Sequence, residues 1–195
     1  MTQLALLRHT RTAWNIDGRL QGRTDIPALE ESLAGLLKLA VPQPYAGWPW
    51  RSSPLLRTRQ TAEALGLAAQ PEPALIETSW GDYEGLTIAQ LQAHYGEDFA
   101  ANEARGLDLL PPNGESPRQV QARLLPWLAE LAQTGVDTGA VTHKGVIRAI
   151  MALAYDWPML GKPPVKLDWK ALHVFRLDAD GTPRPLLMNV TLVPR

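Results

Sequence analysis

Two short apolar segments of this chain each end in a histidine. Residues 3–7 lead directly into Arg8 and His9, and residues 136–142 lead into His143. A short apolar run next to a helical pattern is typical of a buried parallel strand. Because the carboxyl ends of parallel strands meet at the ligand-binding edge of an open α/β sheet, we expect the two imidazoles to face each other across one crevice.

Two helices are predicted from their start signals. Ser53, followed by a proline, is expected to be the N-cap of a helix that runs to about residue 65. Ser116 repeats this signature and adds a capping box through Gln119. Pro126 lies inside this second helix and should kink it or break it in two.

The remaining hydrophobic pattern alternates between helices and strands. Apolar spacing predicts helices over 29–39 and 146–155, and two late strands, 172–177 and 185–192, flank an Asp-Gly turn. Strands that alternate with helices predict a three-layer α/β/α sandwich, with a mostly parallel central sheet and an antiparallel edge strand.

Length and composition are typical of one globular α/β domain. The chain has 195 residues, a formal net charge of −1 and no cysteine. These values exclude disulfide scaffolds, thiolate catalysis and cysteine-ligated metals, and they provide no basic field for nucleic acid or an acidic membrane. We predict a single domain over residues 1–195 with a small helical cap around 87–116. No targeting or membrane-spanning segment is recognised, so a cytoplasmic protein is expected, with a homodimer as one possible assembly.

With so little net charge, an anion site requires a local cluster of cations. Arg8 adjoins the first histidine, and Arg57 lies in the first turn of the helix that follows Ser53. A guanidinium presents a planar fork of donors that matches phosphate oxygens, and a helix N-terminus adds backbone N–H groups. On these grounds alone, a solvated surface role for Arg57 stays open.

Five sequence blocks favour the phosphate interpretation. They occur in order between residues 4 and 150: LLRHTRTAWNIDGRLQGRTDIP (6–27), SSPLLRTRQTAEAL (52–65), LIETSWGDYEGLT (75–87), PNGESPRQVQAR (112–123) and VTHKGVIRAI (141–150). Together they resemble the histidine phosphatase superfamily, which includes cofactor-dependent phosphoglycerate mutases and many small phosphatases. Five ordered blocks are far more specific than an isolated Arg-His pair.

The resemblance implies a catalytic role for five residues. His9 would attack phosphorus as a neutral imidazole and become a phosphohistidine. Arg8, Arg57 and His143 would hold the three equatorial oxygens and offset their charge. Glu77 would protonate the leaving alcohol and then activate water. The resemblance implies no cofactor and no metal ion, and the expected partner is a small phosphorylated metabolite.

We predict five substrate-binding residues, of which the resemblance implies four. Four of them lie on the loop after the first strand: Asn15, Arg19, Gln21 and Gly22. Lys144 is the fifth and stands where the family pattern has glycine. Its side chain is either a further cation at the mouth of the pocket or a solvated lysine in the first turn of a helix.

Two other positions depart from the family pattern or compete with it. Thr10 replaces the usual glycine after the nucleophile, and its β-branched side chain requires ordinary backbone angles. Glu84 is the alternative to Glu77 as proton donor, although the family pattern favours Glu77.

Three functions are compatible with this resemblance. The first is a metal-independent phosphatase that hydrolyses a small phosphate monoester through phosphorylated His9. The second is a phosphoglycerate-mutase-like phosphomutase, which uses the same histidine pair but carries a long insertion between the proton donor and the second histidine. The interval between Glu77 and His143 leaves no room for that insertion, so the sequence favours hydrolysis. The third, a non-catalytic phospholigand-binding protein, is disfavoured because every catalytic group is present.

Overall fold

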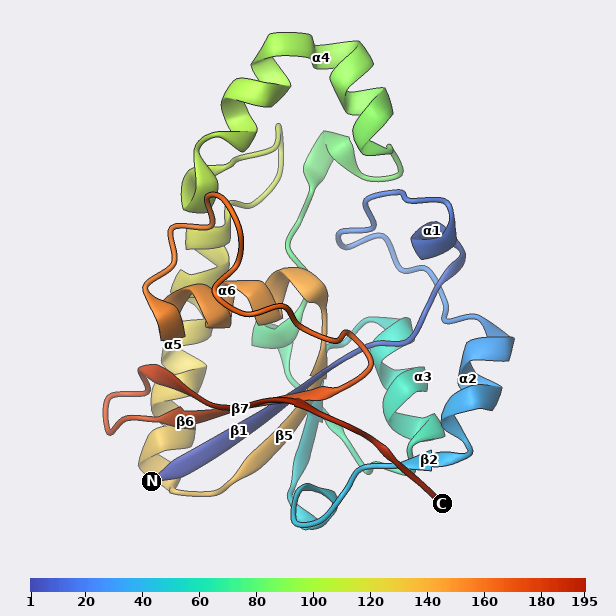
Figure 1. Ribbon diagram of the computed structural model, residues 1–195, viewed down its shortest axis with the longest axis vertical. Helices are drawn as coiled ribbons and strands as arrows, with labels where there is room; N and C mark the ends of the chain where they lie inside the picture. Colours follow the sequence, from blue (N-terminus) through green and yellow to red (C-terminus); the bar gives the residue numbers. More distant parts are fainter.

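A six-stranded sheet forms the centre of the molecule, and helices cover both of its faces (Figure 1). The computed structural model describes every residue from 1 to 195. In order across the sheet, the strands are β4 (Gln70–Pro71), β3 (Trp50–Ser52), β5 (Thr138–Thr142), β1 (Thr2–Arg8), β6 (Leu172–Leu177) and β7 (Pro183–Val190). A separate two-stranded sheet pairs β2 (Leu39–Ala40) with β8 (Val193–Pro194).

The central sheet is mostly parallel. Strands β4, β3, β5 and β1 run in one direction, whereas β6 pairs antiparallel with both β1 and β7. Because β1 is covered on both faces, its central residues are apolar, and Leu4, Ala5, Leu6 and Leu7 are almost completely buried. The predicted α/β/α class with an antiparallel edge is confirmed.

Helices form the outer layers. They are α1 (Ala13–Ile16), α2 (Glu30–Leu36), α3 (Leu56–Ala64), α4 (Ile88–Glu103), α5 (Pro117–Thr134) and α6 (Lys144–Tyr155). Side chains of a strand alternate between its two faces, so Leu4 and Leu6 pack with α5 and α6, whereas Ala5 and Leu7 pack with α2 and α3. None of the helices combines the length and the apolar composition needed to cross a membrane.

Helix α4 lies at the top of the molecule in Figure 1, away from both helix layers. Thr87 caps its N-terminus, and Gly96, with a φ of 52°, interrupts its helical geometry. Only Leu91 and Phe99 of this helix are buried, and they pack with Tyr83. The segment after residue 87 thus builds a small hydrophobic cluster that is separate from the two main cores.

The start of α3 differs from the predicted one. Ser53 is not its N-cap, because the helix begins at Leu56 and Leu55 occupies the cap position. Ser53 instead continues the pairing of β3 with β5, since its N–H donates to the carbonyl of Val141. The missing cap comes from another loop: Asp25 Oδ1 accepts a hydrogen bond from the N–H of Leu56 at 2.8 Å.

Helix α5 begins as predicted but does not break. Ser116 forms the capping box with Gln119, and the helix continues through Pro126 to its last residue. Leu124 and Leu128, on either side of the proline, are fully buried in the core. Their packing outweighs the one backbone hydrogen bond that proline removes.

Two other helix boundaries shift by a few residues. Helix α2 ends at Leu36, because the chain enters β2 at Leu39. Helix α6 begins at Lys144, directly after the histidine that ends the β5 segment. Lys144 is therefore a first-turn residue, as the solvated-lysine interpretation assumes.

Candidate active site

The C-terminal ends of β1 and β5 bring two histidines together. The strands pair in parallel with Arg8 opposite Thr142, so the next residues, His9 and His143, leave the sheet side by side. The N–H of His9 continues the pairing by donating to the carbonyl of Thr142 at 2.9 Å. The two ring centroids are 5.2 Å apart. The predicted meeting of the two imidazoles is therefore confirmed.

His9 is held as a neutral ring with one free nitrogen. Its Nδ1 lies 2.6 Å from the carbonyl oxygen of Thr10, which can only accept, so Nδ1 carries the proton and Nε2 keeps its lone pair. Burial, and after it the positive charges of Arg8 and Arg57, lower the pKa of His9 well below its ordinary value. A buried neutral imidazole with a free nitrogen can act as a nucleophile without first losing a proton.

Thr10 fits the position where the family pattern has glycine. It is not among the residues with a positive φ, so the predicted ordinary backbone is confirmed. Its N–H donates to Thr61 Oγ1 at 3.0 Å, which anchors the loop that follows β1 to α3.

Ser53 orients His143. The Nε2 atom of His143 lies 2.7 Å from Ser53 Oγ, and this hydroxyl accepts a hydrogen bond from the N–H of Leu55. The hydroxyl can therefore donate to Nε2, an assignment that places the imidazole proton on Nδ1. That Nδ1 is buried and has no hydrogen-bond partner within the protein. Burial, and next the neighbouring His9, lower the pKa of His143 well below its ordinary value.

Arg57 is a fully buried cation that is anchored by the backbone. Its Nη2 donates to the carbonyl of Gly22 at 2.7 Å, and its Nη1 donates to the carbonyl of Thr24 at 3.0 Å. Its Nε has no partner within the protein. The two hydrogen bonds fix the guanidinium and, at the same time, the loop that lies between α1 and α2.

Arg8 is anchored differently, because its guanidinium has no hydrogen bond or ion pair within the protein. Its Cζ lies 5.7 Å from the ring centroid of Trp169, and the Nζ of Lys144 lies 5.6 Å from the same ring. The buried side-chain atoms that lack a partner are the Nε atoms of Arg8 and Arg57, Nδ1 of His143, Oε1 of Gln21 and Nε2 of His173. A buried polar atom without a partner costs about 1–3 kcal/mol, and three of these atoms belong to Arg8, Arg57 and His143, the residues whose charge or ring lies close to His9, so they mark a ligand site there.

Glu77 is a buried carboxyl group that lines the same cleft as His9. Its Oε1 accepts from the N–H of Thr78 at 2.9 Å, and its Oε2 accepts from the N–H of Gly145 at 3.4 Å. Burial raises the pKa of Glu77, although these N–H groups and nearby arginines act in the opposite direction. A Cβ atom at residue 145 would lie 2.4 Å from Glu77 Oε1 and from Thr78 Oγ1, so a larger residue there would displace the Glu77 carboxyl group.

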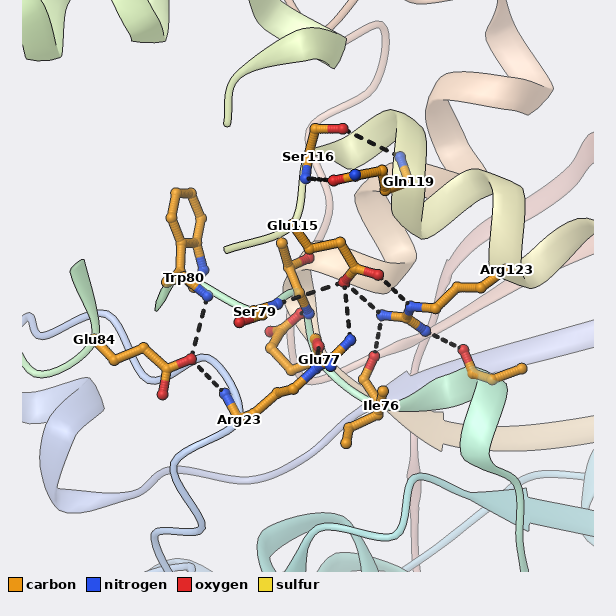
Figure 2. A network of polar contacts seen from close by, with 12 residues as sticks. Arg23, Ile76, Glu77, Ser79, Trp80, Glu84, Glu115, Ser116, Gln119 and Arg123 are labelled. Atoms are coloured by element: carbon orange, nitrogen blue, oxygen red, sulfur yellow. Dashed lines mark hydrogen bonds and ion pairs between the residues drawn. The ribbon is translucent and has the colours of Figure 1, made fainter. Parts of the chain in front are cut away.

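A polar network around Glu115 holds the segment that carries Glu77 (Figure 2). Glu115 binds Arg123 Nε at 2.8 Å and Arg23 Nη2 at 3.3 Å. Arg123 also donates to the carbonyl of Ile76, and Arg23 donates to the carbonyl of Glu77 itself. These contacts tie the Glu77 backbone to the start of α5.

Glu84, the alternative proton donor, is engaged in structural hydrogen bonds. Its carboxylate accepts from the N–H groups of Arg23 at 2.8 Å, Thr24 at 2.9 Å and Trp80 at 3.2 Å, and also from the hydroxyl of Thr24. Figure 2 shows the contacts with Arg23 and Trp80. A carboxylate that accepts four hydrogen bonds acts as a loop anchor, and this arrangement favours Glu77 as the acid.

The site opens into a cleft of about 1050 Å³. All five predicted substrate-binding residues line it: Asn15, Arg19, Gln21, Gly22 and Lys144. Arg8, His9 and Glu77 line it too, whereas Arg57 and His143 are fully buried and do not.

Three of the lining residues also bond to the protein. Asn15 Oδ1 accepts from the N–H of Thr12 in the capping box of α1, which leaves the Asn15 amide nitrogen for a ligand. Arg19 donates to the carbonyl of Gly85 at 2.7 Å. The carbonyl of Gly22 accepts from Arg57, so this glycine contributes to the site through its backbone.

The cleft is lined by more cations than carboxylates. The cations are Arg8, Arg11, Arg19, Lys144 and Arg148, and the carboxylates are Glu77, Glu103 and Glu115. Lys144 and Arg148 are one turn apart on α6 and form no ion pair, and burial is the main cause that lowers the pKa of each. No three His, Asp or Glu side chains are placed to hold a metal ion.

The sequence analysis misses Ser53, Gly145, Glu115 and Trp169 as contributors to this site. Ser53 follows β3, a neighbour of β5, so the strand-end argument that finds the two histidines extends to it. Gly145 and Glu115 lie inside the blocks that resemble the family. Trp169 carries no local signal, since the connection from α6 to β6 brings it to the site.

Comparisons with known proteins agree on one family. The family model described as histidine phosphatase superfamily (branch 1) matches residues 4–191. The 2,3-bisphosphoglycerate-dependent phosphoglycerate mutase 2 of Gloeobacter violaceus is 30% identical over 204 residues, covering 96% of this chain and 91% of that protein. The glucosyl-3-phosphoglycerate phosphatase of Mycobacterium tuberculosis is 33% identical over 183 residues, covering 82% and 80%. Among solved structures, Bacillus stearothermophilus YhfR has a TM-score of 0.84 and 25% identity, covering 98% of each chain.

Proposed function

The chain belongs to branch 1 of the histidine phosphatase superfamily, and from that premise we propose that it hydrolyses a small phosphate monoester through a phosphohistidine at His9. One observation carries the proposal: unpaired buried N–H groups of Arg8, Arg57 and His143 surround a nucleophilic imidazole. These groups supply the positive charge and hydrogen bonds that phosphoryl transfer demands, so the proposed reaction needs no metal ion.

The reaction has two displacement steps at phosphorus. In the first, Nε2 of His9 attacks phosphorus, the bond to the leaving oxygen breaks, and Glu77 gives its proton to that oxygen. In the second, water attacks the phosphohistidine, and the Glu77 carboxylate accepts a proton from this water. The bond between phosphorus and nitrogen breaks, which releases inorganic phosphate and neutral His9.

The electrostatic state of each group supports its role. The lowered pKa of His9 keeps the nucleophile neutral, and the raised pKa of Glu77 keeps the acid protonated to a higher pH than an exposed glutamate. The Nδ1–H of His143 and the guanidinium groups of Arg8 and Arg57 would bind the phosphoryl oxygens, where negative charge develops in the transition state.

The lining of the cleft supports a further set of substrate contacts. We assign this role to Asn15, Arg19, Gln21, Gly22 and Lys144, which line the cleft beside His9. The free amide nitrogen of Asn15 would donate to the phosphate, whereas the unpaired Oε1 of Gln21 would accept from a hydroxyl of the substrate.

The charge of the cleft favours a substrate with a second acidic group. Lys144 and Arg148 line the cleft together with Glu77, which would protonate the leaving group, and neither cation has a carboxylate partner. A carboxylate or a second phosphate on the leaving alcohol would pair with them. Glu103 lines the same cleft and would oppose a substrate of still higher negative charge.

A phosphomutase is the second candidate, and one comparison favours it. The Gloeobacter relative is named as a mutase, and this chain aligns with 91% of its length. The short interval between Glu77 and His143 therefore does not by itself separate the two functions. They differ in the acceptor of the phosphoryl group, which is water for a phosphatase and a substrate hydroxyl for a mutase.

The test is hydrolysis of p-nitrophenyl phosphate and a panel of small phosphate monoesters in the presence of EDTA. The wild type should release inorganic phosphate, and His9→Ala should lower the rate by more than about 1,000-fold. His94→Ala is the matched control, because His94 is exposed on α4.

Three results would contradict the proposal. Activity that EDTA abolishes would contradict metal independence, and retained activity in His9→Ala would contradict the nucleophile. Isomerisation of 3-phosphoglycerate without phosphate release would identify the mutase instead.

A further inference from the structure

The way in which Arg8 is held points to a role for Trp169, which is outside the cleft around Glu77 but lines an adjoining cavity of about 800 Å³ together with Arg8 and His9. Arg8 has no hydrogen bond or ion pair within the protein. Its guanidinium lies over the ring of Trp169, with Cζ 5.7 Å from the ring centroid, and Glu77 acts on it only as a nearby charge that raises its pKa. We propose that Trp169 is a positioning residue, whose indole holds the cationic groups of Arg8 and Lys144 beside His9 by cation–π attraction. This inference rests on the proposed function, because that function assigns Arg8 to phosphate binding and Lys144 to substrate binding.

The indole itself is well anchored. Trp169 packs against the core on the α5–α6 face and meets the ring of His173 edge-on at 6.2 Å. His173 is fully buried in β6, and its Nδ1 accepts from the N–H of Asn189 at 3.3 Å. Asn189 Oδ1 accepts from the N–H of Asp168 at 2.7 Å, which fixes the residue before Trp169. The ring is therefore placed by contacts that do not involve Arg8.

An aromatic partner suits a cation that has to bind phosphate. A carboxylate would also hold Arg8, but it would neutralise the charge and occupy N–H groups that the phosphate needs. The face of an indole attracts a guanidinium through its quadrupole and accepts no in-plane N–H bond. All the N–H donors of Arg8 thus remain available to a phosphoryl group.

The same ring accounts for the position of Lys144. A lysine in the first turn of a helix is disfavoured by the helix dipole, and Arg8 and Arg148 repel it further. The Nζ of Lys144, the residue that replaces the family's glycine, nevertheless lies 5.6 Å from the centroid of the Trp169 ring. Lys144 is exposed, and the indole offsets part of this repulsion and attracts the ammonium towards the cleft.

The experiment compares Trp169→Phe with Trp169→Leu, because both remove the indole but only phenylalanine keeps an aromatic face. Two quantities are measured: kcat/KM for p-nitrophenyl phosphate, and the affinity for orthovanadate by titration calorimetry. We expect Trp169→Leu to lower both by about 10-fold, and Trp169→Phe to retain both within about threefold. Trp48→Leu is the matched control, since Trp48 is also half-buried but packs against Tyr45 on the opposite face of the sheet.

The melting temperature of each Trp169 variant is measured as well, to distinguish a positioning role from a merely structural one. Trp169→Met replaces the leucine variant if that variant does not fold. Equal activity and equal vanadate affinity in the aromatic and aliphatic variants would overturn the proposal. If the wild type hydrolyses none of the phosphate esters, the proposed function fails, but the vanadate measurement still decides whether Trp169 positions the cations.

Discussion

On the α3 side of the site, directional hydrogen bonds hold the functional groups, whereas on the α6 side aromatic rings do so. Arg57 donates to two backbone carbonyls, and His143 is bonded to Ser53. Arg8 and Lys144 instead lie over the ring of Trp169, without hydrogen bonds of their own.

On the α6 side, a second cation lies over an aromatic ring one turn further along the helix. The Cζ of Arg148 lies 5.0 Å from the ring centroid of Trp157, and Trp157 is fixed by a hydrogen bond from Nε1 to the carbonyl of Leu160. Hydrogen bonds impose one orientation, which suits groups that must meet the phosphoryl oxygens in a single geometry. Aromatic faces restrain a cation less tightly, so Lys144 and Arg148 can adapt to the rest of a substrate, and Arg8 keeps its N–H donors free for the phosphoryl oxygens.

The largest effect should come from Glu77, and Glu84, whose carboxylate anchors a loop, provides the comparison. Glu77→Gln should lower kcat/KM for alkyl phosphates by about 10²–10⁴-fold, because their leaving oxygen needs a proton. The rate with p-nitrophenyl phosphate should fall far less, since its leaving group is a weak base. In the wild type, the rate with alkyl phosphates should fall as the pH rises through the raised pKa of Glu77, because the acid form is lost. Glu77→Gln should lack this limb of the pH profile.

Glu84→Gln is the matched control for that experiment. Glu84 accepts hydrogen bonds from Arg23, Thr24 and Trp80, and an amide replaces one acceptor by a donor. Both classes of substrate should therefore slow by the same factor, together with a lower melting temperature. A leaving-group dependence in Glu84→Gln would reassign the acid and break the comparison.

The next effect compares the two arginines by stability. Arg57→Lys should lower the free energy of unfolding by about 2 kcal/mol, because a lysine cannot reach both the Gly22 and Thr24 carbonyls in the geometry of a guanidinium. Arg8→Lys should change it by less than about 0.5 kcal/mol, since Arg8 has no hydrogen bond within the protein to lose. Urea denaturation measures both values, and phosphatase activity should fall in both variants. Equal destabilisation would show that the two sides are held alike.

The smallest effect concerns the cations of α6. Lys144→Ala and Arg148→Ala should each raise KM by about 10-fold for a phosphate ester that carries a second acidic group, because one charge-assisted contact is lost. The change for p-nitrophenyl phosphate should be smaller, since it lacks that group. Lys38→Ala, at an exposed position near β2, controls for the loss of net charge. Equal changes in KM for both substrates would remove the case for a second anionic group.

The parts of this site that follow regular elements could be predicted from the sequence. His9 and His143 end apolar segments, and the parallel pairing of β1 with β5 made their meeting predictable. The capping box at Ser116 depends on residues only three apart, so it too was visible in the sequence. Local patterns of this kind do not require knowledge of the tertiary structure.

The rest depended on contacts between distant segments. Ser53 carries a helix-capping signature, but its N–H pairs with β5 and Asp25 caps α3 in its place. Glu77 and Glu84 can be distinguished only from the tertiary structure, in which the loop after α1 packs against Glu84 and donates N–H groups to its carboxylate. Trp169 reaches Arg8 from the connection that leads into β6, the neighbour of β1, and no pattern in its own segment indicates this contact.

The pairing of β1 with β5 has a consequence for the folding pathway. The two strands come from near the beginning and from the last third of the chain, so we expect their contact to form later than the local helices. A slip of one residue in this pairing would turn the His9 side chain towards the opposite face of the sheet. Catalytic competence during refolding therefore reports the moment at which the first strand finds its correct register, independently of how much helix has already formed.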